Sequence, residues 1–244
     1  MTGLRNAFLS AVLLIIGWQA LSILSGLPKF ILPSATEVLA SMWHNRALIG
    51  EHAVITLAEV ILGMVIGSAL GALTAICLAV SASARNLLRP VLVFSQAVPV
   101  FALAPLLTLW LGYGLPSKIA MAVLIIYFPV TSSFFDGLMQ TPKGFLDLAQ
   151  TMGSSSRRTL YMVRVPAALP ALASGLRLAA VYAPIGAVIG EWVGASKGLG
   201  YLMLLANGRA KTDLMFAAMI VLGIMAVSLY LGVDWLARRT KRGR

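Results

Sequence analysis

The sequence predicts an all-α membrane protein of about six transmembrane helices, forming a single domain over residues 1–244. Of its residues, 59% are hydrophobic and only 11% are charged, whereas a soluble domain carries about 25% charged residues. The mean hydropathy is +0.91. Several apolar runs also reach the roughly 20 residues that a helix needs to cross a bilayer. Composition therefore excludes the soluble classes of protein.

Six apolar runs are interrupted by charged residues, glycine and proline. They cover about residues 7–27, 53–80, 87–112, 117–139, 167–194 and 214–236. The first run is longer than the roughly 7–15 residues of a signal-peptide core. We therefore expect it to be retained as a span.

An amphipathic helix is expected over residues 33–48, between the first two spans. Ser34 and Glu37 have the capping-box spacing of a helix start, and the apolar residues that follow fall on one face. We expect this helix to lie along the external interface, with Trp43 at headgroup depth.

Three ionisable residues lie near the start of the second predicted span. His44 and His52 are the two histidines of the chain and are expected at solvated surface positions. No third ligand lies near them in the sequence, so no metal site is predicted. Glu59 either stays in the external interface or pairs with an arginine.

Two spans carry a glycine at every fourth position, a pattern that lets the backbone of another helix approach closely. The two ridges consist of Gly63, Gly67 and Gly71, and of Gly186, Gly190 and Gly194. They predict tight helix packing. The third span instead carries three prolines, Pro90, Pro99 and Pro105. It is either a broken helix that lines a pathway or a kinked packing helix.

The net charge of +11 is distributed unevenly between the two sides of the predicted bundle. With the N-terminus inside, 13 of the 19 basic residues are cytoplasmic: Arg5, Arg85, Arg89, Lys143, Arg157, Arg158, Arg164, Arg177, Arg238, Arg239, Lys241, Arg242 and Arg244. Six are external: Lys29, Arg46, Lys118, Lys197, Arg209 and Lys211. This bias follows the positive-inside rule and places both termini in the cytoplasm. It favours anionic lipid over nucleic acid as the partner of the basic tail.

Residues 147–166 form the longest polar interruption of the chain and are rich in arginine. Gly153 lies between two short segments that could each be helical, where it can supply the positive φ of a tight turn. Pro166 suits the first turn of the next helix, where its missing N–H has no consequence. The stretch predicts a compact, basic helix–turn–helix loop between two spans.

The spacing of this loop resembles the E-A-A-x3-G-x9-I-x-L-P pattern of ATP-binding-cassette (ABC) importer permeases. Ala149, Gly153 and Pro166 match the pattern, while Asp147 replaces its Glu and Leu148 its first Ala. In that family the loop is a coupling helix that docks on a cytoplasmic ATPase. The resemblance thus implies that residues 143–166 couple this chain to an ATPase.

The same resemblance implies a type I importer permease fold in a bacterial inner membrane. It implies a permease homodimer, two ABC ATPase subunits that bind the ATP and Mg, and an external solute-binding protein. Residues 165–171 and 191–201 also resemble the branch for nitrate, taurine and sulfonates. Residues 95–105 and 184–192 most resemble permeases for the pyrimidine precursor of thiamine.

Catalytic and nucleotide-binding motifs are missing from the sequence. It contains no G-x-x-x-x-G-K-[ST] loop for ATP and no H-E-x-x-H pattern. We therefore expect a non-catalytic subunit without a cofactor of its own. The alternative is a secondary transporter driven by an ion gradient, which would need acids in mid-span and often an inverted repeat. Neither is evident in the sequence.

Polar residues within the spans are the candidates for a translocation path, although each could equally be structural. They are Gln96, Thr108, Tyr127, Ser132, Tyr182 and Glu191. Glu191 either faces the path or lies in the interface, paired with Lys197 or Arg209.

Overall fold

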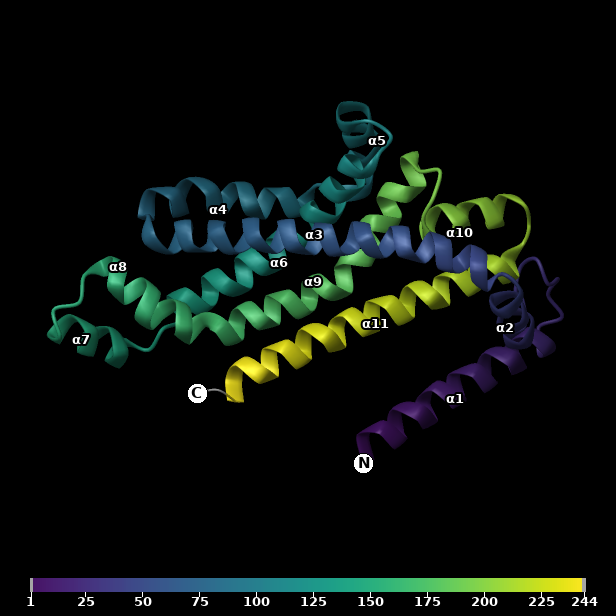
Figure 1. The fold of residues 1–244 in the computed structure, drawn as a ribbon, viewed down its shortest axis with the longest axis horizontal. Coiled ribbons are helices and arrows are strands. Elements are labelled where there is room, and N and C mark those ends of the chain that lie inside the picture. Colours follow the sequence, from purple (N-terminus) through teal and green to yellow (C-terminus); the bar gives the residue numbers. More distant parts are fainter. Residues whose placement is uncertain (1, 243–244) are drawn as a thin grey trace.

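The structure is a computed structural model. It describes the backbone of residues 2–242 and the side chains of residues 5, 6, 9, 10 and 12–239. Within this range every regular element is a helix (Figure 1). The elements are α1 (Thr2–Leu24), α2 (Ala35–His44), α3 (Arg46–Val80), α4 (Ala82–Ala97), α5 (Val100–Leu111), α6 (Leu115–Met139), α7 (Lys143–Thr151), α8 (Ser156–Thr159), a π-helical turn η1 (Leu160–Arg164), α9 (Val165–Gly194), α10 (Leu199–Gly208) and α11 (Thr212–Arg242).

The long helices α3, α6, α9 and α11 run along the long axis of an elongated bundle, with α7 and α8 at one end and α2 and α10 at the other (Figure 1). We call these the coupling end and the far end. Among the described residues, four helices are long and apolar enough to cross a membrane, or five if α4 and α5 form one span. In α1, the described apolar stretch is only Val12–Leu24, so the first predicted span stays a prediction.

Helix α6 is central because both glycine ridges pack against it. A Cβ added to Gly63 of α3 would lie 2.5 Å from the Cβ of Ala122, and one added to Gly186 of α9 would lie 2.7 Å from the Cα of Ala122. Next to these contacts, Ile126 and Val130 of α6 are fully buried. The predicted role of both ridges in close packing is confirmed.

The third predicted span is broken rather than merely kinked. Helices α4 and α5 meet at an angle of 100°, and the break falls at Val98 and Pro99, with Pro99 at the N-cap of α5. Proline cannot donate the backbone hydrogen bond that would continue α4. Pro90 and Pro105, by contrast, lie inside α4 and α5.

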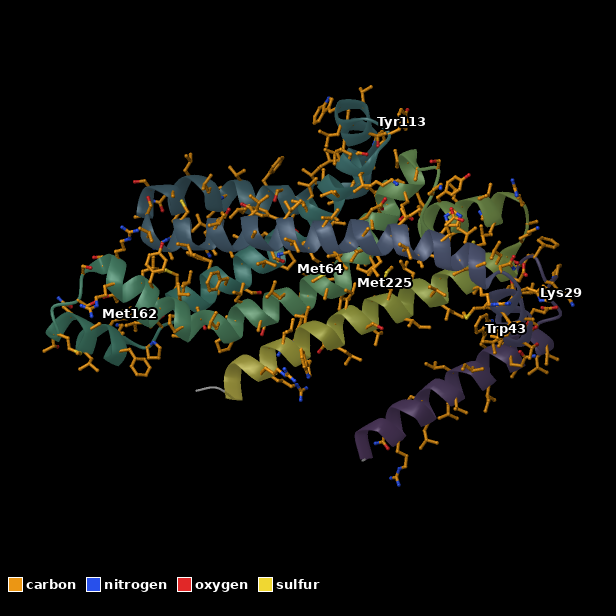
Figure 2. The ribbon with its side chains drawn as sticks, viewed as in Figure 1. Lys29, Trp43, Met64, Tyr113, Met162 and Met225 are labelled. Atoms are coloured by element: carbon orange, nitrogen blue, oxygen red, sulfur yellow. The ribbon has the colours of Figure 1, made fainter. Side chains whose placement is uncertain are left out.

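The interfacial helix forms as the capping pattern predicts. The Ser34 hydroxyl accepts a hydrogen bond from the Glu37 N–H, and the Glu37 carboxylate accepts one from the Ser34 N–H. Trp43 is 69% exposed and lies with Lys29 at the far end (Figure 2).

The next helix, α3, begins at Arg46, several residues before the predicted start of the second span at 53. The sequence prediction missed this because Glu51 and His52 interrupt the apolar run. It also did not include α10.

Candidate functional site

The coupling segment, residues 143–166, begins with α7 and reverses at Gly153. Gly153 has a φ of +70°; its N–H donates to the Gln150 carbonyl, and the Ser154 N–H donates to the Ala149 carbonyl, each at 2.9 Å. This pair of bonds is a Schellman ending, which needs a left-handed residue after the helix. The predicted positive φ at Gly153 is confirmed.

The second half of the coupling segment enters α9 through a π-helical turn. Ser155 caps α8 by accepting a hydrogen bond from the Arg158 N–H at 3.3 Å. The backbone then widens over η1, where the Val165 N–H donates to the Leu160 carbonyl, and Pro166 falls in the first turn of α9 as predicted. Single π-helical turns are often found at functional sites.

The surface of the coupling segment is apolar and basic. Phe145, Leu148 and Met152 are 57%, 58% and 77% exposed, and Asp147 is exposed next to a buried Ala149. Its three arginines, Arg157, Arg158 and Arg164, take part in none of the ion pairs found among the described residues. Met162 lies at the same end of the molecule (Figure 2).

An open cavity of about 1010 Å³ separates the coupling segment from the ends of α3 and α6. Arg85, Arg157 and Arg164 line it together with serine and threonine side chains. Arg85 is held in place, because its Nε donates to the Leu78 carbonyl at 3.1 Å. The coupling end is therefore cationic and open.

A buried ionic network lies toward the far end, where α3, α6 and α9 meet. The Lys118 ammonium donates to Oε1 of Glu59 at 2.8 Å, and Glu59 is fully buried. Of the two alternatives for Glu59, pairing is therefore correct, but the partner is a lysine that the sequence analysis had placed outside. Lys118 is only 7% exposed.

Glu191 ties the α9–α10 turn to α3. Its Oε1 accepts from the Thr56 hydroxyl at 2.6 Å, and its Oε2 accepts from the Gly200 N–H. The Thr56 hydroxyl in turn accepts from the Leu199 N–H at 2.8 Å. Glu191 is 1% exposed, so neither expected interfacial pairing occurs; Lys197 instead pairs with Glu51 at 3.3 Å.

His52 of α3 also bonds to this turn, so the expectation that it lies at a solvated surface is wrong. It is 8% exposed rather than solvated, and its Nδ1 accepts from the Gly198 N–H at 2.9 Å. Gly198 has a φ of +114°, and a Cβ there would lie 2.2 Å from Cδ of Glu191. In the described part of the chain, no three His, Cys, Asp or Glu side chains could together hold a metal ion.

The candidate path residues are spread over the bundle. Thr108 is buried. Its methyl group lies 2.8 Å from the position of a Cβ added to Gly194. Thr108 therefore packs against the same end of α9 that carries Glu191. The Tyr127 hydroxyl contacts the Thr74 hydroxyl at 2.9 Å. The other three lie apart from Glu191: Gln96 is exposed beside the α4–α5 break, Ser132 lines a cavity of about 150 Å³ with Arg85 and Arg89, and Tyr182 is 41% exposed.

Sequence reasoning missed Lys118, Thr56 and His52 as members of one network. Lys118 follows a Gly-Leu-Pro-Ser turn and is typical of a loop; its partner Glu59 is 59 residues away. Glu59 also lies inside α3 and not at one of its ends. The one local signal was the presence of two acids, Glu59 and Glu191, in otherwise apolar spans.

A helical membrane bundle with this helix–turn–helix segment is the architecture of a transport permease. Residues 63–243 match the family model of the binding-protein-dependent transport system inner membrane component, and the chain belongs to this family of ABC importer permeases. An inward-facing structure of the MetNI methionine ABC transporter covers 76% of this chain and 92% of its own, with a TM-score of 0.67 at 19% identity. This likeness shows the type I importer permease fold.

Curated relatives extend over almost the whole chain. A probable ABC transporter permease protein of Haemophilus influenzae is 50% identical over 97% of this chain and 96% of its own. The formylaminopyrimidine transport permease protein ThiX of Halalkalibacterium halodurans is 34% identical over 88% and 86%. The taurine transport system permease protein TauC of Escherichia coli is 29% identical over 94% and 86%. The branch expected from the sequence is confirmed.

Proposed function

We propose that this chain is the transmembrane subunit of an ATP-driven, binding-protein-dependent importer, and that residues 143–166 couple it to a cytoplasmic ATPase. The supporting observation is the surface of the coupling segment. Three exposed apolar side chains and three arginines without an ion-pair partner among the described residues lie around a turn that Gly153 fixes. An apolar patch edged with charge is typical of a protein interface.

The full assembly under this proposal contains two copies of this chain, two ATPase subunits and an external solute-binding protein. The ATPases bind ATP and Mg, since this sequence has no phosphate loop of its own. The chain lies in the bacterial inner membrane with both termini in the cytoplasm, as the distribution of basic residues favours.

We further propose a small solute as the cargo, either of the nitrate, taurine and sulfonate type or the pyrimidine precursor of thiamine. The names of the relatives support both classes, because one transports formylaminopyrimidine and another taurine. A competition assay separates the two. If the cargo is the pyrimidine, uptake of labelled pyrimidine in proteoliposomes with the cognate binding protein should be blocked by excess unlabelled pyrimidine and unaffected by taurine. If the cargo is taurine, uptake of labelled taurine should be blocked by unlabelled taurine and unaffected by the pyrimidine.

Gly153→Arg tests the coupling segment, with Gly208→Arg in α10 as the matched control. Both glycines are exposed, and no atom lies within 4 Å of the position of an added Cβ, but only Gly153 has a positive φ. We expect Gly153→Arg to insert normally but to lose ATPase co-purification and uptake, while Gly208→Arg keeps both. Wild-type uptake by Gly153→Arg would contradict the proposed role of this turn.

The ion-gradient alternative has one observation in its favour, the two acids buried within spans. Membership of the importer permease family weighs against it. Uptake that survives ATP depletion but stops with an uncoupler would support the alternative. Uptake that stops when ATP is depleted, but continues with an uncoupler as long as ATP is supplied, supports the importer.

A further inference from the structure

The buried network contains one acid more than it has bases. Glu59, Glu191 and Lys118 are 0%, 1% and 7% exposed. If both carboxyls were ionised, the single ammonium would leave one negative charge unbalanced. An isolated charge buried away from water is so unfavourable that a group normally neutralises instead.

Among the described residues, no second cation is paired with either carboxyl. Helix α3 contributes His52, whose Nδ1 is occupied by the Gly198 N–H, and the hydroxyl of Thr56. Helix α6 contributes only Lys118, and the α9–α10 turn contributes backbone N–H groups. The nearby Lys197 is 59% exposed and pairs with Glu51.

The hydrogen bonds identify where a proton is missing. Both oxygens of Glu191 and Oε1 of Glu59 have donors, from Thr56, Gly200 and Lys118. Oε2 of Glu59 is buried and has no hydrogen-bond partner among the described residues, and the Glu191 carboxyl is the acid next to it. Two carboxylates cannot donate to one another. One proton held between Oε2 of Glu59 and the Glu191 carboxyl satisfies the orphaned atom and balances the charge.

We propose that Glu59 and Glu191 form a proton-binding site that holds one shared proton and keeps the α9–α10 turn closed. The cluster then consists of one carboxylate, one carboxylic acid and one ammonium, with no net charge. When the proton leaves, two carboxylates face each other in a buried site. The α9–α10 turn then opens before α3 moves, because Gly198 and Gly200 pack directly on the Glu191 carboxyl. Glu59, in contrast, lies in the interior of the long helix α3.

Charge-balanced variants of the purified chain test the proton count by thermal unfolding at neutral pH. Glu59→Gln mimics the protonated acid, because its amide accepts from Lys118 and donates to Glu191, so its melting temperature should stay near that of the wild type. Glu59→Gln with Glu191→Gln leaves Lys118 without a counter-charge and should melt much lower. Adding Lys118→Met to this double variant should restore much of the loss. A single Glu59→Gln as unstable as the double variant would overturn the proposal.

Infrared spectroscopy gives a readout that does not depend on stability. The wild type should show the C=O stretching band of a protonated carboxyl at neutral pH, Glu59→Gln should lose it, and Glu37→Gln, at a partly exposed position outside the network, should keep it. Hydrogen exchange at the Leu199 and Gly200 amides should rise as alkaline pH removes the band, and Glu59→Gln should abolish this pH dependence. A wild type without the band at neutral pH would overturn the proposal.

Discussion

The two ends of the bundle treat their charges in opposite ways. At the far end, Glu59, Lys118 and Glu191 are buried and bonded to one another or to the turn that they support. At the coupling end, Arg157 and Arg158 are exposed and belong to none of the ion pairs of the described chain. One end is therefore complete within a single chain, while the charges of the other remain available to a partner.

This difference indicates where substitutions act. A change in the buried network should alter folding itself, because a charge without its partner cannot reach water. A change at the coupling end should leave the fold intact and alter association, because exposed charges mainly affect the rate and salt dependence of encounter.

Lys118→Met should have the largest effect. It leaves the two buried acids, which together keep one negative charge, without their ammonium, and breaking a buried pair typically costs about 3–5 kcal/mol. Lys197→Met is the matched control, since it removes an exposed lysine from a pair with Glu51, and exposed pairs contribute about 0–1 kcal/mol. Thermal unfolding in the same detergent measures both, and equal melting temperatures would remove the contrast between buried and exposed pairs.

Gly63→Val should follow in size. Its Cβ would overlap that of Ala122 on the central helix, and overpacking a tight contact typically costs about 1–3 kcal/mol. Gly223→Val in α11 is the control, because no atom lies within 4 Å of its added Cβ. The fraction of monodisperse protein in size-exclusion chromatography compares the two. A well-behaved Gly63→Val would mean that α3 and α6 are less tightly packed than described.

Arg157→Gln combined with Arg158→Gln should change association without changing stability. We expect binding to the ATPase subunit to weaken several-fold at low salt and to differ little from wild type at high salt, because salt screens exposed charges. Arg46→Gln at the far end serves as the control. This prediction rests on the proposed function, and a melting temperature that falls together with binding would place these arginines in the fold instead.

The smallest effect concerns the start of α2. The hydrogen bond and ion pair from Lys29, together with the bonds from Ser34, hold the pKa of Glu37 at about 2 instead of 4.5. Because this pKa is lowered by folding, the ionised carboxylate stabilises the folded state above about pH 4.5. This stabilisation is lost as the pH falls toward 2. Trp43 fluorescence should stay constant from pH 8 to 5 and change below about 4. In Glu37→Gln this acid transition should be absent.

Local features were predictable from sequence, and long-range ones were not. The turn at Gly153 and the cap at Ser34 depend on residues within five positions of each other, so their pattern is visible in the chain. The glycine ridges were predictable because they repeat with the period of a helix. Thr56 and Glu191, in contrast, are 135 residues apart. Nothing in the neighbourhood of either residue specifies the other, and the lysine between them resembles a loop residue.

The break between α4 and α5 leads to an expectation about how long this chain lasts in a cell. Its two helices have 16 and 12 residues, about 24 Å and 18 Å at 1.5 Å per residue, and a bilayer core is about 30 Å thick. Neither half crosses alone, and the backbone at the exposed Pro99 needs protein or water as a neighbour. Under the proposed function, a copy synthesised without its partners would lack the protein neighbours of this corner. We expect membrane quality-control proteases to remove such orphan copies, so that the amount of this subunit follows the amount of the whole assembly.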